Sequence, residues 1–221
     1  LVAALGAATL AVVAAACGDI ATPEVALTPS PSATPLPIPT PTPTLRTAET
    51  PVLIPIVIGP IDGVLTHNED DNFVKVFASE VNFADVVAEV TFSNPYPTSV
   101  GSWSYGFLFR RQAHVNFHAV AIRSDGTWEH RLLTDSTYEP TLVEETSASI
   151  DTTPDDSNHL KILALGEFGA LFINGSYIGA LDLSGLTGTG DVNVMTGFGV
   201  GDQVNGELTG FEDFAVWSIF R

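Results

Sequence analysis

The sequence predicts an all-β domain built as an antiparallel sandwich or barrel. Three observations lead to this prediction. Apolar and polar residues alternate with a period of two through most of residues 61–221, the alternating stretches are rich in β-branched and aromatic residues, and turn-forming residues separate them. No long stretch shows a clean helical repeat. Many short strands with Gly-rich turns are typical of sandwiches and barrels.

The first strands are expected between short turns. The alternation predicts strands over residues 73–77, 84–92 and 115–122. Turn signals follow the second and third of these, at Asn94-Pro95-Tyr96-Pro97 and Ser124-Asp125-Gly126-Thr127. Strands at this close spacing with turns between them indicate an antiparallel arrangement.

A hairpin is the best-defined unit. Residues 169–173 and 177–181 flank Asn174-Gly175, whose tolerance of positive φ suits a type I′ turn. Residues 159–165 are expected to pair with this hairpin, and residues 210–219 to form the closing strand. In that closing strand we expect core positions for Phe211, Val216 and Trp217.

A different composition precedes the strands. Residues 1–16 carry no charge and end at Cys17, the single cysteine of the chain. A run of this length matches the apolar region of a secretory signal and is short for a bilayer span. Because the chain starts at Leu1 with neither Met nor a basic segment, we expect the sequence to be truncated at its start. An uncleaved membrane anchor is the alternative.

Ala14, Ala15, Ala16 and Cys17 resemble the lipobox of bacterial lipoproteins, although Ala14 stands where a leucine is usual. The resemblance implies acylation of Cys17 and attachment to the membrane on its extracytoplasmic side. Two or more acyl chains would hold the protein stably, whereas one chain binds reversibly. A single cysteine also allows no internal disulfide.

Proline dominates the segment between Cys17 and the strands. Residues 22–60 hold 11 of the 15 prolines, a composition that favours polyproline II. At ~3.1 Å per residue, thirty residues of such a tract reach on the order of 90 Å. We therefore expect a signal segment over 1–17, a Pro/Thr-rich linker over 18–60 and one domain over 61–221.

The predicted domain is strongly acidic. Residues 61–221 contain 23 acidic and 7 basic side chains, a difference of −16. This charge repels phosphate backbones, so nucleic acid is not an expected partner. The acidic residues are scattered rather than blocked, which indicates a solvated surface.

Three segments carry a resemblance to a known fold family: SNHLKILALGEFGALFINGSYIGALDLSG, MTGFGVGD and FEDFAVWSI. Together they resemble the second half of a concanavalin A-like lectin/glucanase domain of the laminin-G-like group. The resemblance implies a jelly-roll β-sandwich, as found in extracytoplasmic domains of bacterial membrane proteins and lipoproteins. It does not select an activity, because this fold hosts lectins, glycosidases and interaction modules.

The sequence offers no pattern for glycoside hydrolysis, which needs two carboxylates flanking the scissile bond. Glu144-Glu145 and Glu212-Asp213 are adjacent pairs, so their members are expected on opposite strand faces. Glu129 shares a face with the cation Arg131, which holds a carboxylate ionised. We therefore expect no enzyme activity.

Histidines and acidic loops suggest metal sites only weakly. His114 and His118 share a strand face with Asn116, but about 13 Å separates the two imidazoles, too far for one zinc. His130 on the next strand could approach one of them. Calcium is the only cofactor that the sequence suggests, although solvated loops are the alternative. The weak calcium candidates are Asp70, Asp71, Asp155 and Asp156.

A strip of aromatic and polar side chains is the candidate ligand site. Rings and amides that share strand faces give stacking surfaces and oriented hydrogen bonds, as sugar sites require. The members of this strip are Trp103, Tyr105, Arg110, His114, Asn116, His118, Trp128 and His130. The alternative is that Trp103 and Trp128 belong to the core.

The expected function is that of a non-catalytic, lipid-anchored binding module outside the cytoplasmic membrane, with a glycan or another cell-envelope ligand. Two other hypotheses remain open. One is a structural or accessory surface domain without a small ligand, which buried tryptophans and no groove would favour. The other is a divergent glycoside-active enzyme, which convergent carboxylates in a groove would favour.

The anchor hypothesis makes a direct prediction. Changing Cys17→Ser removes the thiol that would be acylated, so the variant should leave the membrane fraction or accumulate unprocessed. Cell fractionation with a size comparison checks this. Membrane attachment of the variant at the mature size would contradict the lipoprotein hypothesis.

Overall fold

The computed structural model describes residues 56–68, 74–112, 116–135, 137–138, 140–199 and 201–219. Several sequence-based predictions lie outside these residues: Cys17, the linker as far as residue 55, His114, Asp70 and Asp71. The part of the chain that is described contains no helix that is long and apolar enough to cross a bilayer.

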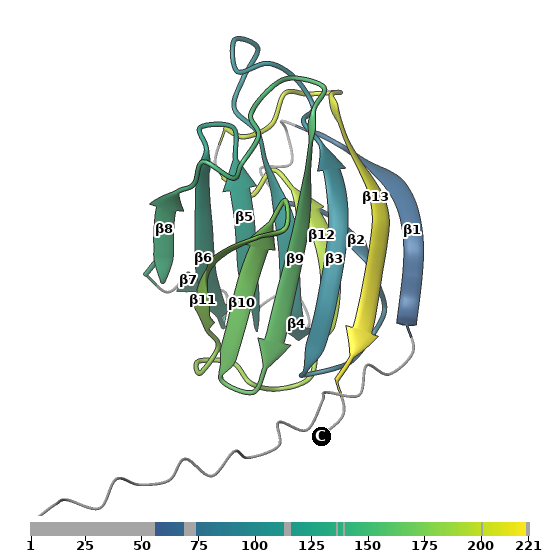
Figure 1. Cartoon of the computed structure of the whole chain (residues 1–221), viewed down its shortest axis with the longest axis vertical. Helices are drawn as coiled ribbons and strands as arrows, with labels where there is room; N and C mark the ends of the chain where they lie inside the picture. Colours follow the sequence, from purple (N-terminus) through teal and green to yellow (C-terminus); the bar gives the residue numbers. More distant parts are fainter. Residues whose placement is uncertain are drawn as a thin grey trace, which may run out of the picture. The chain divides into compact units, whose positions relative to one another are not determined.

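Six strands form the first sheet, called sheet A, in the order β1-β13-β3-β9-β10-β11 (Figure 1). Their bounds are β1 (Ile56–Thr66), β3 (Val86–Ser93), β9 (Ser157–Leu165), β10 (Phe168–Ile173), β11 (Ser176–Asp182) and β13 (Leu208–Ser218). Every neighbouring pair is antiparallel.

The second sheet, sheet B, runs β2-β12-β4-β5-β6-β7, and β8 also pairs with β6. Its strands are β2 (Lys75–Ala78), β4 (Ser104–Gln112), β5 (Asn116–Arg123), β6 (Thr127–Thr134), β7 (Thr137–Tyr138), β8 (Val143–Thr146) and β12 (Asp191–Thr196). All of these pairings are antiparallel as well. The two sheets stack as the layers of a sandwich (Figure 1), which confirms the predicted all-β jelly-roll architecture.

The first strand begins earlier than the sequence suggested. β1 starts at Ile56, ahead of the predicted domain boundary at residue 61. It pairs with the closing strand β13 from Ile56 opposite Trp217 to Thr66 opposite Leu208. The first and last strands therefore lie side by side, which their distance in the sequence does not reveal.

The predicted hairpin is confirmed. β10 and β11 pair on either side of Asn174 and Gly175, whose φ angles are 50° and 80°. Both values are positive, as a type I′ turn requires. The Asn174 Oδ1 also accepts the His159 N–H at 2.8 Å, so the turn is fixed to β9.

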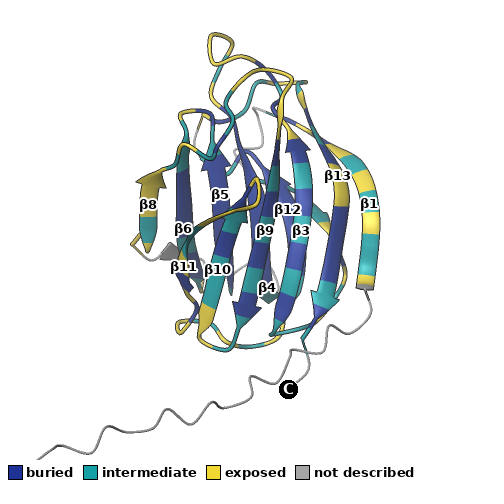
Figure 2. Ribbon diagram, viewed as in Figure 1, coloured by how far each residue is buried: buried dark blue, intermediate teal, exposed yellow. Residues whose placement is uncertain are grey.

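The main core is formed by residues of both sheets, and Figure 2 shows buried positions along the strands of each. Alternate residues of each strand point inward, which is the expected consequence of a period-two pattern. The largest fully buried side chains include Trp103, Trp128, Tyr105, Phe92, Phe107, Phe109, Phe211 and Phe214. Burial of such large apolar side chains is worth roughly 1.5–3 kcal/mol each and dominates the stability of the domain.

The closing strand contains a bulge that changes which side chains face the core. The register of β13 against β3 shifts between Glu212 and Ala215, and Asp213 has a φ of 56°. Phe211 and Phe214 both turn inward as a result, with their rings 6.4 Å apart. The expected burial of Phe211 and Val216 is confirmed, but Trp217 is only partly buried because alternation directs it away from Val216.

A second apolar cluster lies on the other face of sheet B. Its members come from β4, β5, β6 and β12, and they are Leu108, Phe117, Ala119, Ala121, Leu133 and Met195. Consequently β4 and β5 are buried on both faces and read as nearly continuous apolar runs.

Candidate functional site

The aromatic members of the predicted ligand strip lie inside the sandwich. Trp103 and Tyr105 are stacked with their rings 5.0 Å apart and 2° from parallel, and neither is exposed. The Trp103 Nε1–H donates to the Tyr96 carbonyl at 3.1 Å. Trp128 is also buried, at 2% exposure. These rings pack the core.

The Tyr105 hydroxyl belongs to a buried hydrogen-bond network. It donates to the Asn94 Oδ1 at 2.6 Å and accepts from the Asn158 Nδ2 at 2.8 Å. Asn158 in turn accepts the Asp151 N–H at 2.8 Å and so holds the loop between β8 and β9. Burial is the main cause that raises the pKa of Tyr105.

Arg110 is fully buried at the opposite end of β4. Its guanidinium donates to three backbone carbonyls, those of Ala84, Leu186 and Gly166, at 2.7–2.9 Å. The Asp85 carboxylate lies 3.6 Å away. Since these contacts join three separate loops, Arg110 holds the fold together and faces no ligand.

His118 and His130 form a buried pair on β5 and β6. The His118 Nδ1 lies 3.1 Å from the His130 Nε2, and the His118 Nε2 lies 3.2 Å from the Leu186 carbonyl. The carbonyl can only accept, so the His118 Nε2 carries its proton and the His118 Nδ1 accepts from His130. The remaining ring nitrogen, the His130 Nδ1, carries a lone pair that has no hydrogen-bond partner among the described residues.

Both histidines are held neutral. Burial lowers the pKa of His118 to about 4, with the Arg110 charge acting in the same direction. Burial, followed by the neighbouring His118, lowers the pKa of His130 to about 3. The expectation that His130 approaches a histidine of the preceding strand is confirmed.

The predicted strip is therefore corrected: its described members do not form an exposed face. Trp103, Tyr105, Arg110, His118, Trp128 and His130 are all buried. Asn116 is half-buried, and its Oδ1 accepts the Asp135 N–H at 2.7 Å. The physical reason is that the shared face points toward sheet A, where these side chains fill the core.

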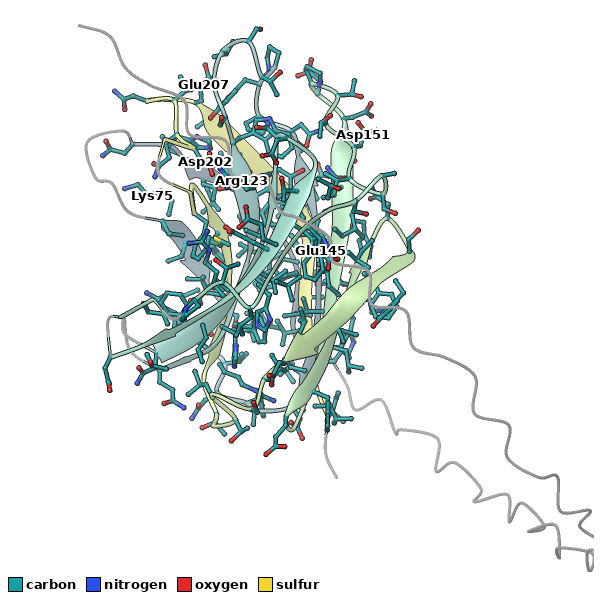
Figure 3. All side chains as sticks on the ribbon, turned by 90° about the vertical axis from the view of Figure 1, so that its left-hand side faces the viewer. Lys75, Arg123, Glu145, Asp151, Asp202 and Glu207 are labelled. Carbon is teal, nitrogen blue, oxygen red and sulfur yellow. The ribbon has the colours of Figure 1, made fainter. Side chains whose placement is uncertain are left out.

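The described calcium candidates lie in one exposed loop between β8 and β9. Asp155 and Asp156 are exposed, and the Asp156 carbonyl accepts the Asn94 N–H at 2.8 Å. Figure 3 shows Asp151 of the same loop at the end of the domain that also carries Asp202 and Glu207. Across the described ranges, no three His, Cys, Asp or Glu side chains are grouped to hold a metal ion.

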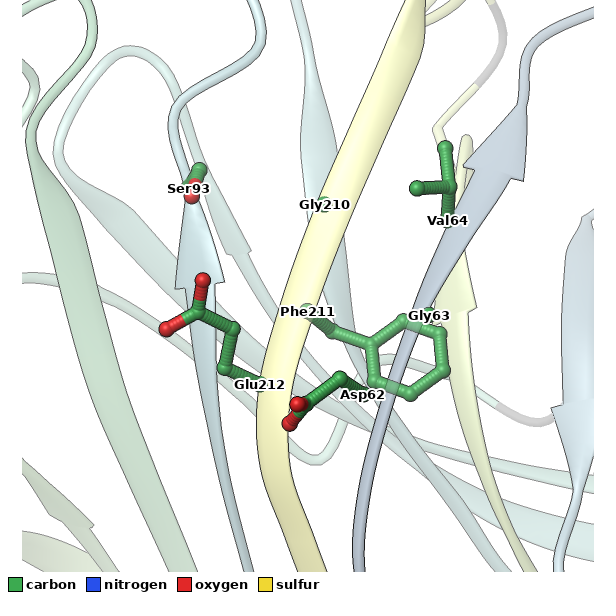
Figure 4. A pocket seen from close by; sticks show the side chains of 7 residues that line it. All are labelled: Asp62, Gly63, Val64, Ser93, Gly210, Phe211 and Glu212. Carbon is green, nitrogen blue, oxygen red and sulfur yellow. The ribbon is translucent and has the colours of Figure 1, made fainter.

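A groove of about 350 Å³ lies on the outer face of sheet A, where β1, β13 and β3 run side by side (Figure 4). We call it the β1–β13–β3 groove. Its lining residues are Asp62, Gly63, Val64, Ser93, Gly210, Phe211 and Glu212. Gly210 has no side chain, so the floor of the groove lies close to the backbone of β13.

The groove presents hydrogen-bond acceptors beside an apolar wall. Figure 4 shows the Glu212 carboxylate reaching toward β3 and the Asp62 carboxylate between β1 and β13. The Asp62 Oδ1 accepts the Asp213 N–H at 2.9 Å, which fixes the orientation of that carboxylate. Val64 is 58% exposed, and Ser93 adds a hydroxyl. No lining residue carries a positive charge.

Sequence patterns did not reveal this groove. Asp62 lies beside the predicted domain boundary, and alternation alone predicts only that Glu212 and Asp213 point to opposite faces of a strand. The two carboxylates line one groove because β1 pairs with β13, a contact between the first and last described strands. The glycines at 63 and 210 were the available signal, since glycine inside a strand often marks a close approach.

Comparison with known proteins supports the fold. No family model and no curated protein matches the sequence. Among solved structures, the chain is similar to the carbohydrate-binding module CBM66 from Bacillus subtilis, with 14% identity over 66% of this chain and 82% of that chain, and a TM-score of 0.52. It is also similar to a glycosidic hydrolase, with 10% identity over 73% of this chain and 80% of that chain, and a TM-score of 0.50. The domain is a jelly-roll β-sandwich.

The histidine pair predicts a loss of stability in acid. Above pH 6.5 both histidines are neutral in the folded and the unfolded chain. As the pH falls from 6.5 toward 4, both histidines become protonated in the unfolded chain but stay neutral in the folded one. The free energy of unfolding therefore decreases. Each histidine contributes up to about 1.4 kcal/mol per pH unit. Urea unfolding midpoints measured across this range check the slope.

A matched pair of variants isolates this effect. His130→Gln keeps a donor toward His118 and should reduce the slope by about one histidine's share. Phe168→Ala, which removes a ring that is 76% exposed and no titratable group, should leave the slope unchanged. Equal slopes in the parent and in His130→Gln would contradict the assignment.

The tyrosine network predicts a second stability effect. Tyr105→Phe leaves the buried Asn94 Oδ1 and Asn158 Nδ2 each with one partner fewer, which should lower the free energy of unfolding by about 1–3 kcal/mol. The control Tyr177→Phe removes a hydroxyl from a tyrosine that is 60% exposed and should change it by less than about 0.5 kcal/mol. Equal effects of the two variants in urea denaturation would rule out a stabilising network.

Proposed function

We propose that the domain is a non-catalytic binding module that holds a carbohydrate in the β1–β13–β3 groove. The groove itself carries this proposal. It combines two carboxylates, a hydroxyl and an exposed valine in about 350 Å³. Sugar hydroxyls donate well to carboxylates, while the apolar wall takes the C–H face of a ring.

The fold supports this proposal because similar structures belong to proteins that handle carbohydrates. One similar structure is named as a carbohydrate-binding module and another as a glycosidic hydrolase. Since the same architecture serves both kinds of protein, the site must decide between them. The groove offers oriented acceptors, which suit binding.

Charge narrows the class of carbohydrate. Two carboxylates and no cation line the groove, and the chain from residue 61 onward carries 23 acidic against 7 basic residues. Glycans that carry uronate or sulfate are repelled by such a field. The ligand expected here is therefore neutral or carries an amine.

The module is further proposed to act outside the cytoplasmic membrane, attached through an acylated Cys17. The support comes from the sequence: an apolar run ends at a lone cysteine, and a proline-rich tract follows it. A spacer of this kind would display the groove away from the lipid surface. Nucleic acid is not a proposed partner, because the charge is of the wrong sign.

One observation favours an enzyme as the second candidate. Asp62 and Glu212 bring two carboxylates into one groove, and glycoside hydrolysis uses two carboxylates on either side of a bond. A hydrolase would release new reducing ends from a bound oligosaccharide. The binding test below therefore includes that measurement.

The test is an array of neutral, amine-bearing and uronate-bearing glycans, including peptidoglycan fragments, probed with the whole chain. Neutral or amine-bearing glycans should bind and uronates should not. Running the array with and without calcium shows whether the exposed Asp155 and Asp156 loop takes part. Failure to bind any glycan in either condition would favour a structural domain without a small ligand.

Two variants with the same charge change connect binding to the groove. Glu212→Gln weakens a charge-assisted hydrogen bond and should lower affinity about tenfold. Glu145→Gln removes an exposed carboxylate from β8 of sheet B and should leave affinity unchanged. Equal affinities of these two variants would move the site elsewhere, and reducing ends released by the parent would establish the enzyme.

A further inference from the structure

A row of side chains crosses the outer face of sheet A from β3 to the edge strand β11. The register places Glu89 opposite Lys161, Lys161 opposite Phe172, and Phe172 opposite Tyr177. These residues alternate with buried neighbours in β3, β9 and β10, so they share the outer face. The row ends in aromatic rings beside the Asn174-Gly175 turn.

The aromatic end of this row is open to solvent. Tyr177 is 60% exposed, and its ring meets Phe172 edge to face, with centroids 5.6 Å apart at 67°. The edge contact holds the tyrosine ring in place while leaving much of it uncovered. An ordered and exposed aromatic surface of this kind stacks on the apolar face of a sugar ring.

Polar side chains connect the groove to these rings. Glu212 of the groove lies opposite Thr91, and Thr91 lies opposite His159. Lys161 is held by the Glu89 carboxylate at 3.1 Å and keeps 44% of its side chain exposed. A hydroxyl, an imidazole and an ammonium group thus line the path between carboxylates and aromatic rings.

The length of this path sets the size of ligand that could use both ends. Four strand spacings separate β13 from β11 in the sheet order. At ~4.8 Å per spacing they span about 19 Å. A single sugar ring is too short for this distance, whereas a linear oligosaccharide that crosses the strands would reach both the groove and Tyr177.

We propose that Tyr177 and Phe172 form a second subsite for the ligand of the groove, so that the domain selects linear oligosaccharides over short sugars. This inference rests on the proposed carbohydrate-binding function. The groove provides hydrogen-bond acceptors at one end, and the aromatic pair provides stacking at the other. The part of the oligosaccharide between these two ends crosses β3, β9 and β10.

The test is calorimetric titration of the whole chain with cello-oligosaccharide and laminari-oligosaccharide ladders, from the disaccharide to the octasaccharide. Affinity should rise with chain length and level off once the ligand spans about 19 Å. Tyr177→Ala should remove this rise, with a loss of about three- to tenfold for the longest ligands. Phe168→Ala, which removes a ring that is 76% exposed at the other end of β10, should keep the rise.

The outcomes separate the two proposals. Glu212→Gln should lower affinity at every chain length, because it alters the groove. If oligosaccharides bind but affinity does not depend on length, or if Tyr177→Ala keeps the full rise, the second subsite is wrong and the groove stands. If no saccharide of either ladder or of the array binds, both proposals fall. A change in sedimentation of Tyr177→Ala without a change in binding would assign the rings to contact between copies and overturn the subsite.

Discussion

The contact between the two sheets at Tyr105 is the constraint on which the rest of the domain depends. The ring of Tyr105, on sheet B, stacks on Phe92 of sheet A with centroids 4.5 Å apart, and on Trp103, which directly precedes β4. Its hydroxyl ties Asn94 to Asn158. The Tyr105 ring joins the two sheets by stacking, and its hydroxyl holds the loops that carry Asn94 and Asp151 through its hydrogen bonds. A single side chain therefore links the core to the loops. An unpaired polar group at this depth would be destabilising, which is why both asparagines are satisfied.

The same logic explains why polar residues inside the sandwich do not form a ligand site. Arg110, His118 and His130 occupy the opposite end of the core, where they bind loop carbonyls and each other. Leu186 receives both the Arg110 guanidinium and the His118 ring, so these groups fix the connection between β11 and β12. These polar residues, which the sequence suggested as part of a sugar site, therefore hold the loops at this end of the domain in place. Burial, which holds both histidines neutral, also gives the domain its expected sensitivity to acid.

The outer face of sheet A carries the groove and the aromatic pair, of which Tyr177 is exposed. The outer face of sheet B carries a second apolar cluster, whereas sheet A shows carboxylates, hydroxyls, bases and an aromatic pair to solvent. Pairing of β1 with β13 places Asp62 and Glu212 along one groove, and the Asp213 N–H in the bulge donates to Asp62. The groove is thus a consequence of how the first and last strands close the sheet. Its open, acidic character suits a ligand rich in hydroxyl groups.

The sequence by itself determined the all-β class and the β10–β11 hairpin with its Asn174-Gly175 turn. Both follow from local rules, alternation with a period of two and positive φ at a two-residue turn. Phe211 and Val216 are five residues apart, so they share the core face only because of the bulge between Glu212 and Ala215. Only the tertiary structure decided which face of a strand meets the other sheet. Alternation shows that Trp103 and Tyr105 share a face with period two, yet the same alternation fits a face turned to solvent. The groove was equally out of reach, because β1 and β13 meet through pairing between distant segments, and a bulge shifts their register.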